Sequence, residues 1–517
     1  MGHSALGQMR VGDILDAAAM RFAHQEAFYC TSTGRRLSFA QARERANRLA
    51  NGLLGLGLRK GDCVAFLSTN RVEMAEIYFA LAKSGLVGLP LNYRLAPNEM
   101  VVLMQEVGAV ALICERQFAP IAVQAREAIA TLRTLVAFGE GDTPGLHDYE
   151  TLLAQASAAQ PAVEVNEHDP HYFNLTSGTT GLPKCYLISH YNMTCLFPMF
   201  HTLDMRGGDV ILTVFPMYGR VGFGWVACGM LWGCRNVLMN FDAGEALRLI
   251  AREHVTITNL VPTMGAMLLA RPELDETDLS SLRGVVFVGS LLPAPVREGV
   301  MARLCPRLYE YYGMQETSTL VVSTPEDRAR RPDSVGRPLP FAQVRIVDAQ
   351  GRDVPTGETG EVIGRSPGTV TSYYKNPEKS AETFRDGWLH TGDLGRLDAQ
   401  QYLYINGRLK DVIVTGGQNV HAGEVEETIL GMPEVSDCTV VGLSDPLWGE
   451  VVTAVVVPAK DQDVEPEAVI AWCRKSLAGF KTPKHVLVRS EPLPRTPTGK
   501  VQKFLLVRQY DASGKAK

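Results

Sequence analysis

A loop rich in hydroxyls and glycines, closed by a lysine, is the stretch of this sequence best suited to chemistry on phosphates. It reads Thr176-Ser177-Gly178-Thr179-Thr180-Gly181-Leu182-Pro183-Lys184. The two glycines let the backbone turn tightly and bring N–H groups close to an anion, while the hydroxyls add donors and Lys184 adds a mobile cation. The spacing is not that of a Walker A loop, G-x-x-x-x-G-K-[ST]. The residues predict a phosphate-binding loop of another type, with a polar surface loop between strands as the alternative.

Further segments that combine glycines with charged or aromatic residues follow this loop. In chain order they are Tyr312-Gly313-Met314-Gln315-Glu316, Gly387-Trp388-Leu389-His390-Thr391-Gly392-Asp393, Gly407-Arg408-Leu409-Lys410-Asp411, Gly416-Gly417-Gln418-Asn419 and Pro494-Arg495-Thr496-Pro497-Thr498-Gly499-Lys500. Together with the first loop, the series resembles the adenylate-forming superfamily of acyl-CoA and aryl-CoA ligases, peptide-synthetase adenylation domains and luciferases. The resemblance covers nearly the whole chain. It implies a ligase that uses ATP, Mg²⁺ and coenzyme A to convert a small-molecule carboxylic acid into an acyl adenylate and then into a thioester.

The charged residues of these segments suit that reaction. A carboxylate that attacks the α-phosphate of ATP meets another anion and must expel pyrophosphate, so the site needs cations and donors aimed at the developing charge. The resemblance implies that Glu316 holds Mg²⁺, which prefers oxygen ligands, and that Lys500 bridges the carboxylate and the α-phosphate. Thr180 completes the implied catalytic residues. The alternatives are a solvated charge for Glu316 and a flexible surface charge for Lys500.

The same resemblance implies a set of nucleotide contacts. Tyr312 resembles the residue that stacks on adenine, Asp393 suits the ribose because one carboxylate accepts hydrogen bonds from two hydroxyls, and Arg408 resembles a second anchor with a permanent charge. In isolation they would be a core aromatic, a turn aspartate and a surface arginine. Gln315 stands where the family commonly has threonine, and its amide can still donate. The full implied set for ATP and AMP is Thr176, Ser177, Gly178, Thr179, Thr180, Gly181, Lys184, Ser290, Tyr312, Gly313, Gln315, Glu316, Asp393, Arg408 and Lys500.

Lys410 falls where the family has a hinge between its two domains. The resemblance implies that the small domain rotates after adenylation, withdraws Lys500, and brings Gly416 and Gly417 to the pantetheine arm of CoA, since glycine permits close approach by a ligand. A simple turn is the alternative for this glycine pair. The surroundings of Lys500 also resemble those of reversibly acetylated lysines. A lysine acetyltransferase is therefore an implied regulatory partner, because acetylation removes the charge.

The acyl pocket is expected around the segment Phe215-Pro216-Met217-Tyr218-Gly219-Arg220. Related ligases often have histidine or an aromatic residue where this chain has Gly219. Glycines at 219, 222 and 224 indicate either space for a bulky or elongated acyl group or close helix packing, and the sequence does not decide between them. Arg220 is expected to pair with a second carboxylate on the substrate or to be a surface or nucleotide-side charge. The predicted pocket residues are Tyr218, Gly219, Phe287, Gly289 and Met314.

Short apolar runs that alternate with amphipathic stretches position these motifs. Residues 63–67 and 86–91 are typical of buried strands and 72–84 of a helix that Gly85 ends, so they predict a βαβ unit. Similar runs at 110–114, 257–261 and 285–288 favour parallel sheets covered by helices, and 343–364 favours antiparallel strands. After Lys410 a separate small α/β pattern begins, with strands near 412–414, 439–443, 451–457 and 485–488 and helices near 424–430 and 466–477.

We therefore predict an α/β fold with two domains. The first, residues 1–409, is an AMP-binding domain with the acid and ATP sites, built from two doubly wound sheets and a small β-barrel-like subdomain. The second, residues 410–517, is a smaller, mobile α/β domain that carries Lys500.

Composition narrows the function classes. A net charge of -5 over 517 residues lacks the excess of positive charge that is typical of nucleic-acid-binding proteins. Ten cysteines show no metal-site spacing, which argues against structural zinc and predicts buried thiols. Neither a signal peptide nor an apolar run long enough to span a bilayer is found, so a cytoplasmic location is expected. Contact with a membrane surface and a homodimeric state stay open.

Two other functions fit parts of the pattern. One is a stand-alone adenylating enzyme for a carrier protein or an amino acid. Amino-acid adenylation domains present an aspartate near the position of 217–220, which this chain lacks, and no carrier domain is expected because the chain ends soon after Lys500. The other is a non-catalytic nucleotide sensor, for which neither Glu316 nor Lys500 would be needed.

Overall fold

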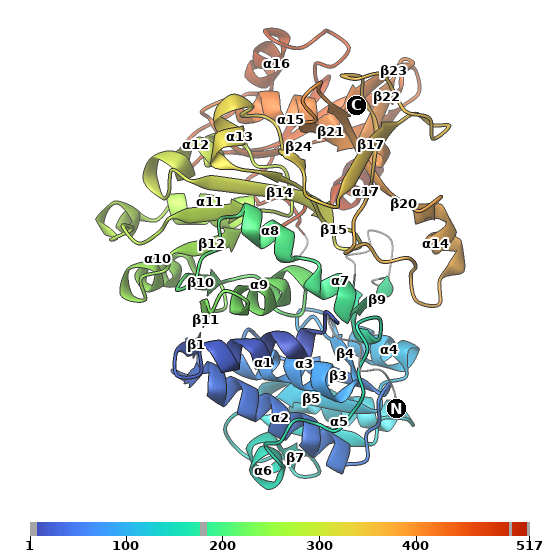
Figure 1. Ribbon diagram of the computed structural model, residues 1–517. Helices are drawn as coiled ribbons and strands as arrows, with labels where there is room; N and C mark the ends of the chain where they lie inside the picture. The colour runs from blue at the N-terminus through green and yellow to red at the C-terminus, as the bar shows by residue number, and fades with distance from the viewer. Residues whose placement is uncertain (1–7, 176–183, 496–498, 514–517) are drawn as a thin grey trace.

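The computed structural model describes residues 8–175, 184–495 and 499–513, and four β-sheets organise them (Figure 1). A seven-stranded sheet, a nine-stranded sheet and a small antiparallel sheet precede residue 409. The fourth sheet belongs to a smaller C-terminal domain, at the opposite end of the molecule from the seven-stranded sheet in Figure 1. The predicted α/β fold class is confirmed.

The seven-stranded sheet has the order β7-β6-β5-β3-β4-β8-β9, and all its neighbours are parallel except β8 and β9. The predicted βαβ unit is confirmed as β3-α3-β4, and Gly85 ends α3 with a left-handed φ of 67°. The strands are β3 (Cys63–Leu67), β4 (Val87–Pro90), β5 (Ala111–Glu115), β6 (Thr134–Phe138), β7 (His147–Asp148), β8 (Pro170–Leu175) and β9 (Cys185–Ser189). Its helices are α2 (Phe39–Gly55), α3 (Val72–Ser84), α4 (Pro97–Val107), α5 (Ala119–Ala128) and α6 (Tyr149–Gln155).

The nine-stranded sheet has the order β16-β15-β14-β13-β12-β10-β11-β1-β2. Its central strands are parallel, and its edges are antiparallel hairpins. The strands are β1 (Glu26–Cys30), β2 (Arg36–Ser38), β10 (Val210–Thr213), β11 (Arg235–Leu238), β12 (Ile257–Leu260), β13 (Gly284–Phe287), β14 (Leu308–Met314), β15 (Ser318–Ser323) and β16 (Arg337–Pro338). The accompanying helices are α1 (Val11–Arg21), α7 (His190–Thr194), α8 (Phe197–Thr202), α9 (Arg220–Met230), α10 (Ala243–Arg252), α11 (Pro262–Leu269), α12 (Ala294–Arg303) and α13 (Pro325–Arg330).

The remaining sheets lie toward the C-terminus. The small antiparallel sheet contains β17 (Gln343–Val347), β18 (Gly360–Arg365), β19 (Phe384–Arg385), β20 (Trp388–Leu397) and β21 (Leu403–Arg408), with α14 (Pro377–Thr383) beside it. The C-terminal domain contains β22 (Val412–Thr415), β23 (Gln418–His421), β24 (Val435–Asp445), β25 (Gly449–Pro458), β26 (His485–Val488), α15 (Ala422–Leu430), α16 (Pro466–Arg474) and α17 (Lys503–Ser513). The predicted hinge, Lys410, lies in the single 3₁₀ turn Leu409–Asp411 between these two sheets. The predicted boundary itself stays a prediction.

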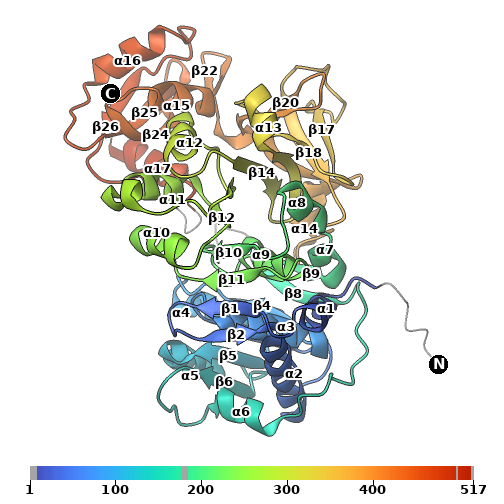
Figure 2. The same ribbon diagram turned by 60° about the vertical axis from the view of Figure 1, so that its left-hand side comes forward.

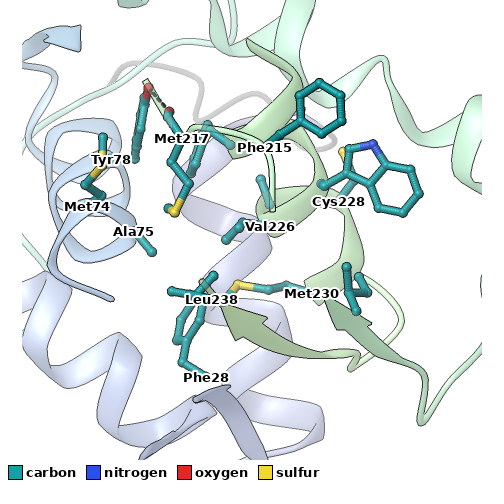
Figure 3. Close-up of a cluster of buried hydrophobic side chains, with 14 of the residues drawn as sticks. Phe28, Met74, Ala75, Tyr78, Phe215, Met217, Val226, Cys228, Met230 and Leu238 are labelled. Carbon is teal, nitrogen blue, oxygen red and sulfur yellow. Dashed lines mark hydrogen bonds between the residues drawn. The ribbon is translucent and has the colours of Figure 1, made fainter. Parts of the chain in front are cut away.

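A shared apolar core lies between the two large sheets, and it positions the segment predicted to border the acyl pocket (Figure 3). The rings of Tyr78 in α3 and Phe223 in α9 stack with centroids 3.8 Å apart. The Tyr78 hydroxyl donates to the carbonyl of Met217 at 2.8 Å. Asn70 donates to the Phe215 carbonyl and accepts from the Met217 N–H, both at 2.8 Å. The seven-stranded half of the protein therefore holds the chain that leads into α9.

The expectations about cysteines and membranes can be compared with the described residues. All ten cysteines are free, and all but Cys195 are buried. The part of the chain that the structure describes contains no cluster of three metal-ligating side chains. Within the same ranges, every helix is too short or too polar to cross a bilayer.

Figure 2 shows the C-terminal domain lying over α11 and α12 of the large domain.

Candidate active site

Asp393 is the centre of a hydrogen-bonded group formed by two sheets. The pairing of β20 with β21 places Asp393 directly opposite Arg408, whose Nε lies 2.8 Å from Asp393 Oδ1. The Tyr312 hydroxyl, from β14, donates to Asp393 Oδ2 at 2.8 Å. Asp393 is 5% exposed, and a carboxylate has lone pairs for further donors beyond these two. The structure therefore brings together the three residues predicted to bind the nucleoside.

Thr391 fixes the backbone at Asp393, and the sequence analysis gave it no role of its own. Its hydroxyl donates to the Val362 carbonyl at 2.6 Å and accepts from the Asp393 N–H at 3.0 Å. Glu361, on the neighbouring strand, accepts from the Gly392 N–H at 3.2 Å and contacts His390 Nδ1 at 2.8 Å. Threonine and histidine inside the segment 387–393 were the available signal for this network.

The Glu316 carboxylate lies in a second group, with Tyr373 and Lys184. Glu316 is 6% exposed, and its Oε1 accepts from the Tyr373 hydroxyl at 2.7 Å. Burial and the negative charge of Glu316 raise the pKa of Tyr373, so its hydroxyl stays a donor. The Lys184 ammonium lies 4.9 Å from the centroid of the same ring. Tyr373 thus contacts both the predicted metal ligand and the predicted phosphate cation, and the sequence analysis missed it.

Gly313 and Gln315 lie in the hairpin that carries Glu316. A Cβ at Gly313 would lie 2.0 Å from the Ser318 carbonyl oxygen, so only glycine fits this close pairing of β14 with β15. The Gln315 side-chain oxygen accepts from Asn174 Nδ2 at 2.9 Å, which leaves the amide NH₂ as its donor group. Met314, which lies between Gly313 and Gln315 in the sequence, is the last residue of β14. Asn174 is a further residue that the sequence did not indicate.

Lys500 reaches these groups from the C-terminal domain. Burial by the surrounding protein is the largest cause of its lowered pKa. Arg408 and Lys410 lower the pKa further, whereas Asp393 and Glu316 raise it. Near Lys500, Arg495 pairs with Asp437 at 2.7 Å and donates to the Gly499 carbonyl at 2.6 Å.

Lys184 shares this electrostatic environment. Burial is the largest cause of its lowered pKa, and the ammonium groups of Lys379 and Lys410 lower it further, while Glu316 raises it. Lys410 itself has a lowered pKa through burial and through Arg408. Several cations packed this closely repel one another unless an anion lies between them. The arrangement is suited to a polyanion such as a triphosphate.

The glycines near the predicted acyl pocket differ in their surroundings. A Cβ at Gly222 would lie 2.3 Å from the Pro216 carbonyl oxygen, and one at Gly224 would lie 3.2 Å from Leu196. Among the described residues, a Cβ at Gly219 would meet only that same Pro216 oxygen, at 3.6 Å. Close packing therefore explains Gly222 and Gly224, whereas Gly219 has room beside it. Burial raises the pKa of the neighbouring Tyr218 to about 12.

The remaining residues predicted for the acyl pocket, the nucleotide site and the CoA site lie elsewhere in the structure. Phe287 is fully buried at the end of β13, and a Cβ on Gly265 of α11 would approach its ring to 2.9 Å. Gly289 has a left-handed φ of 102°, and Ser290 after it is exposed. Gly416 and Gly417 form the two-residue loop of the β22–β23 hairpin, with φ values of 56° and 77°. That loop geometry by itself requires glycine, and the CoA role stays a prediction.

Arg220 is not a surface charge, and no carboxylate of the described residues pairs with it. It is 3% exposed and donates to three main-chain carbonyls, those of Gln315, Asn192 and Gly368, at 2.8, 2.9 and 2.8 Å. The expectation that it binds a substrate carboxylate has no support in these contacts. The predicted residues Thr176, Ser177, Gly178, Thr179, Thr180 and Gly181 lie outside the described residues.

Comparison with known proteins agrees with this geometry. A family model described as "AMP-binding enzyme" matches residues 15–374, and one described as "AMP-binding enzyme C-terminal domain" matches residues 424–500. A feruloyl-CoA synthase from an Amycolatopsis species is 35% identical, over 92% of this chain and 94% of that protein. A long-chain-fatty-acid–CoA ligase from Mycobacterium tuberculosis is 34% identical, over 94% and 96%. The crystal structure of an anthranilate CoA ligase in complex with anthranoyl-AMP superposes with a TM-score of 0.91 at 28% identity, covering 98% of each chain. The chain therefore belongs to the AMP-binding enzyme family and is an AMP-forming acid–thiol ligase.

Proposed function

We propose that this chain activates a carboxylic acid with ATP and transfers the acyl group to coenzyme A. In the first step an acid oxygen attacks the α-phosphorus of ATP, the bond to the bridging oxygen breaks, and pyrophosphate leaves. In the second step the CoA sulfur, having lost its proton to solvent, attacks the acyl carbonyl and AMP leaves. The observation that carries the proposal is that the buried carboxylate of Asp393 accepts from the Tyr312 hydroxyl and pairs with Arg408, both at 2.8 Å, so the three residues predicted to bind the nucleoside lie together.

The cations would act on the first step. Lys500 would bridge the acid oxygen and the α-phosphate and so reduce the repulsion between two anions. Lys184 would contact the outer phosphates, next to the loop at 176–183. Both lysines have lowered pKa values mainly through burial and partly through neighbouring cations. Binding of a triphosphate would relieve that repulsion, which favours the nucleotide over an uncharged ligand.

The nucleoside would be held at the other end of the cleft. Asp393 would accept hydrogen bonds from the ribose hydroxyls with the lone pairs left beside Tyr312 and Arg408. Arg408 would orient the Asp393 carboxylate through their 2.8 Å ion pair. Tyr312 would border the adenine.

The residues present fit a magnesium ion held mainly by the substrate. Mg²⁺ is usually bound through one or two carboxylates together with phosphate oxygens and water. Glu316 offers one buried carboxylate, oriented by Tyr373 at 2.7 Å, and the described residues contain no larger cluster of acidic ligands. Mg²⁺ would be held by Glu316 and would neutralise charge on the phosphates. Tyr373 would orient that carboxylate, and Lys184 would contribute positive charge.

The second step would use the mobility proposed for the C-terminal domain. Rotation about Lys410 would withdraw Lys500 and present the hairpin loop at Gly416 and Gly417 to the pantetheine arm of CoA. A Cβ at Gly416 would lie 2.6 Å from the Trp448 ring, whereas a Cβ at Gly417 would meet none of the described residues within 4 Å. A ligand backbone or arm could therefore approach closely there. Acetylation of Lys500 would stop the first step by removing its charge.

The acid site is proposed at the start of α9, beside Tyr218 and Gly219. Room beside Gly219 favours an acyl group with a ring or a chain over a small acid. The acids to test follow from the relatives: ferulate and other cinnamic acids, anthranilate, and long-chain fatty acids.

Pyrophosphate exchange tests the proposal. Purified protein is supplied with ATP, Mg²⁺ and each acid, with and without CoA, and exchange and AMP release are followed. We expect acid-dependent exchange without CoA, and multiple turnovers of AMP only when CoA is present. Exchange with AMP release dependent on a carrier protein instead of CoA would favour the stand-alone adenylating enzyme. Absence of exchange with every acid, in protein that binds ATP, would contradict adenylation.

A further inference from the structure

Arg220 is a buried cation that the proposed reaction does not use. It is the first residue of α9 and is 3% exposed. The positive end of the helix dipole disfavours a cation at that place. Its acceptors are the main-chain carbonyls of Gln315, Asn192 and Gly368. Burying a charge against neutral acceptors is costly, so the arrangement calls for a structural reason.

The three carbonyls belong to three segments that are distant in sequence. Gln315 is in the turn between β14 and β15, Asn192 is in α7, and Gly368 is in the segment 366–373 that leads to Tyr373. A guanidinium is planar and presents several donors in a fixed fork, so it can join three acceptors at defined angles. Arg220 therefore ties these segments to the first turn of α9.

The turn that carries Glu316 is held at three successive carbonyls. The Gln315 carbonyl accepts from Arg220 at 2.8 Å, the Glu316 carbonyl accepts from the Val370 N–H at 2.8 Å, and the Thr317 carbonyl accepts from the Ser366 hydroxyl at 2.8 Å. Two of these donors come from the segment 366–373, which Arg220 also holds through Gly368. Arg220 thus acts on the turn both directly and through that segment.

We propose that Arg220 is a positioning residue for the metal-holding turn. By fixing the main chain at Gln315, it sets the direction of the Glu316 carboxylate toward Mg²⁺ and the triphosphate before they bind. The inference rests on the proposed function, in which Glu316 holds the metal. A lysine would keep the charge but would lose the planar fork. Arg220→Lys should therefore weaken magnesium-dependent ATP binding.

Arg328 provides a matched control. It is also buried, at 5% exposed, and it donates to the Pro332 carbonyl at 2.6 Å and to Glu310. It lies in α13, whose contacts are with β14 and β15 away from the Glu316 turn. Arg328→Lys should lower thermal stability by removing a comparable set of bonds, without changing how ATP binding depends on Mg²⁺.

The experiment is a calorimetric titration of ATP into wild type, Arg220→Lys and Arg328→Lys at a series of Mg²⁺ concentrations. We expect Arg220→Lys to raise the Mg²⁺ concentration for half-maximal ATP affinity by about tenfold, which corresponds to one strong hydrogen bond. Arg328→Lys should stay within about twofold of wild type.

The outcomes separate the inference from the proposed function. If wild type fails to bind ATP at any Mg²⁺ concentration, the proposed function falls, and the role of Arg220 with it. If wild type binds and Arg220→Lys shows the same Mg²⁺ dependence, only the role of Arg220 falls. Should Arg220→Lys not fold, Ser366→Ala provides a second test, because it removes the hydroxyl that donates to the Thr317 carbonyl of the same turn. It should raise the Mg²⁺ requirement about threefold, and an unchanged value would overturn the inference.

Discussion

His171 and His190 form a stacked pair in the interior, and acid should destabilise the fold through them. Their ring centroids are 5.0 Å apart, and both side chains are 0% exposed. His171 Nε2 donates to the Tyr78 carbonyl at 3.1 Å, and the Val11 N–H donates to His190 Nδ1 at 3.3 Å. Burial lowers the pKa of His171 to about 4. Burial, followed by His171, Arg10 and Lys60, lowers the pKa of His190 to about 2.

The magnitude follows from proton linkage. In the unfolded chain a histidine has a pKa of about 6.5, so below that pH the unfolded state binds protons that the folded state excludes. The contribution of each neutral histidine is fully present above pH 6.5 and is lost as the pH falls toward the folded pKa. Between pH 7 and pH 5, each should remove about 2 kcal/mol from the free energy of unfolding, and the pair about 4 kcal/mol.

The variant His190→Asn isolates one member of the pair, because its side-chain oxygen keeps an acceptor for the Val11 N–H. His201→Asn, at an exposed histidine of α8, is the control. The free energy of unfolding is measured by urea titration at pH 7 and pH 5. The decrease between the two pH values should be about 2 kcal/mol smaller in His190→Asn than in wild type, and unchanged in His201→Asn. A decrease in His190→Asn as large as that of wild type would refute the reasoning.

Three further substitutions probe the proposed site. Lys500→Ala removes the cation proposed to bridge the acid and the α-phosphate, so it should abolish acyl-adenylate formation but spare thioester formation from added acyl adenylate; surviving pyrophosphate exchange would contradict this. Tyr373→Phe removes the 2.7 Å hydrogen bond to Glu316 and should raise the Mg²⁺ requirement for ATP binding about tenfold by calorimetry, whereas an unchanged requirement would show that Glu316 is oriented without it. Gly219 has a φ of -100°, which any residue can adopt, so the backbone tolerates Gly219→Phe. This substitution should lower kcat/KM for ring-bearing or long-chain acids about tenfold more than for acetate. Equal losses for all acids would place the pocket elsewhere.

Local elements were predictable because their signals are short-range. The helix Val72–Ser84 shows its apolar face and its terminating glycine within one segment, and its predicted bounds agree with those of α3. The antiparallel strands after 343 and the C-terminal strands at 412–415 and 485–488 follow from the same patterns. By contrast, no local pattern indicated that β1 and β2, near the N-terminus, lie at the edge of the nine-stranded sheet, because strand pairing depends on contacts between distant segments.

The residues of the candidate site likewise divide into those that a local sequence pattern indicated and those that it did not. Glu316, Asp393, Arg408 and Lys500 were indicated because each lies in a segment whose spacing of glycine and charge matches a family pattern. Tyr373 and Arg220 lie outside those segments, and nothing in their neighbouring residues shows that one contacts Glu316 and the other contacts Gln315.

The amino-acid sequence alone determined the family resemblance, the α/β class and the chemical types that a nucleotide site requires, since these depend on residue identity and on local periodicity. The tertiary structure decided which charges lie together: Lys410 lowers the pKa values of both Lys184 and Lys500 only because chain segments far apart in the sequence meet in space. It also decided that Gly222 and Gly224 serve packing while Gly219 has free space, and that Arg220 is a structural cation. Coulomb forces and steric contacts act through space, so their balance is fixed by folding and not by order along the chain.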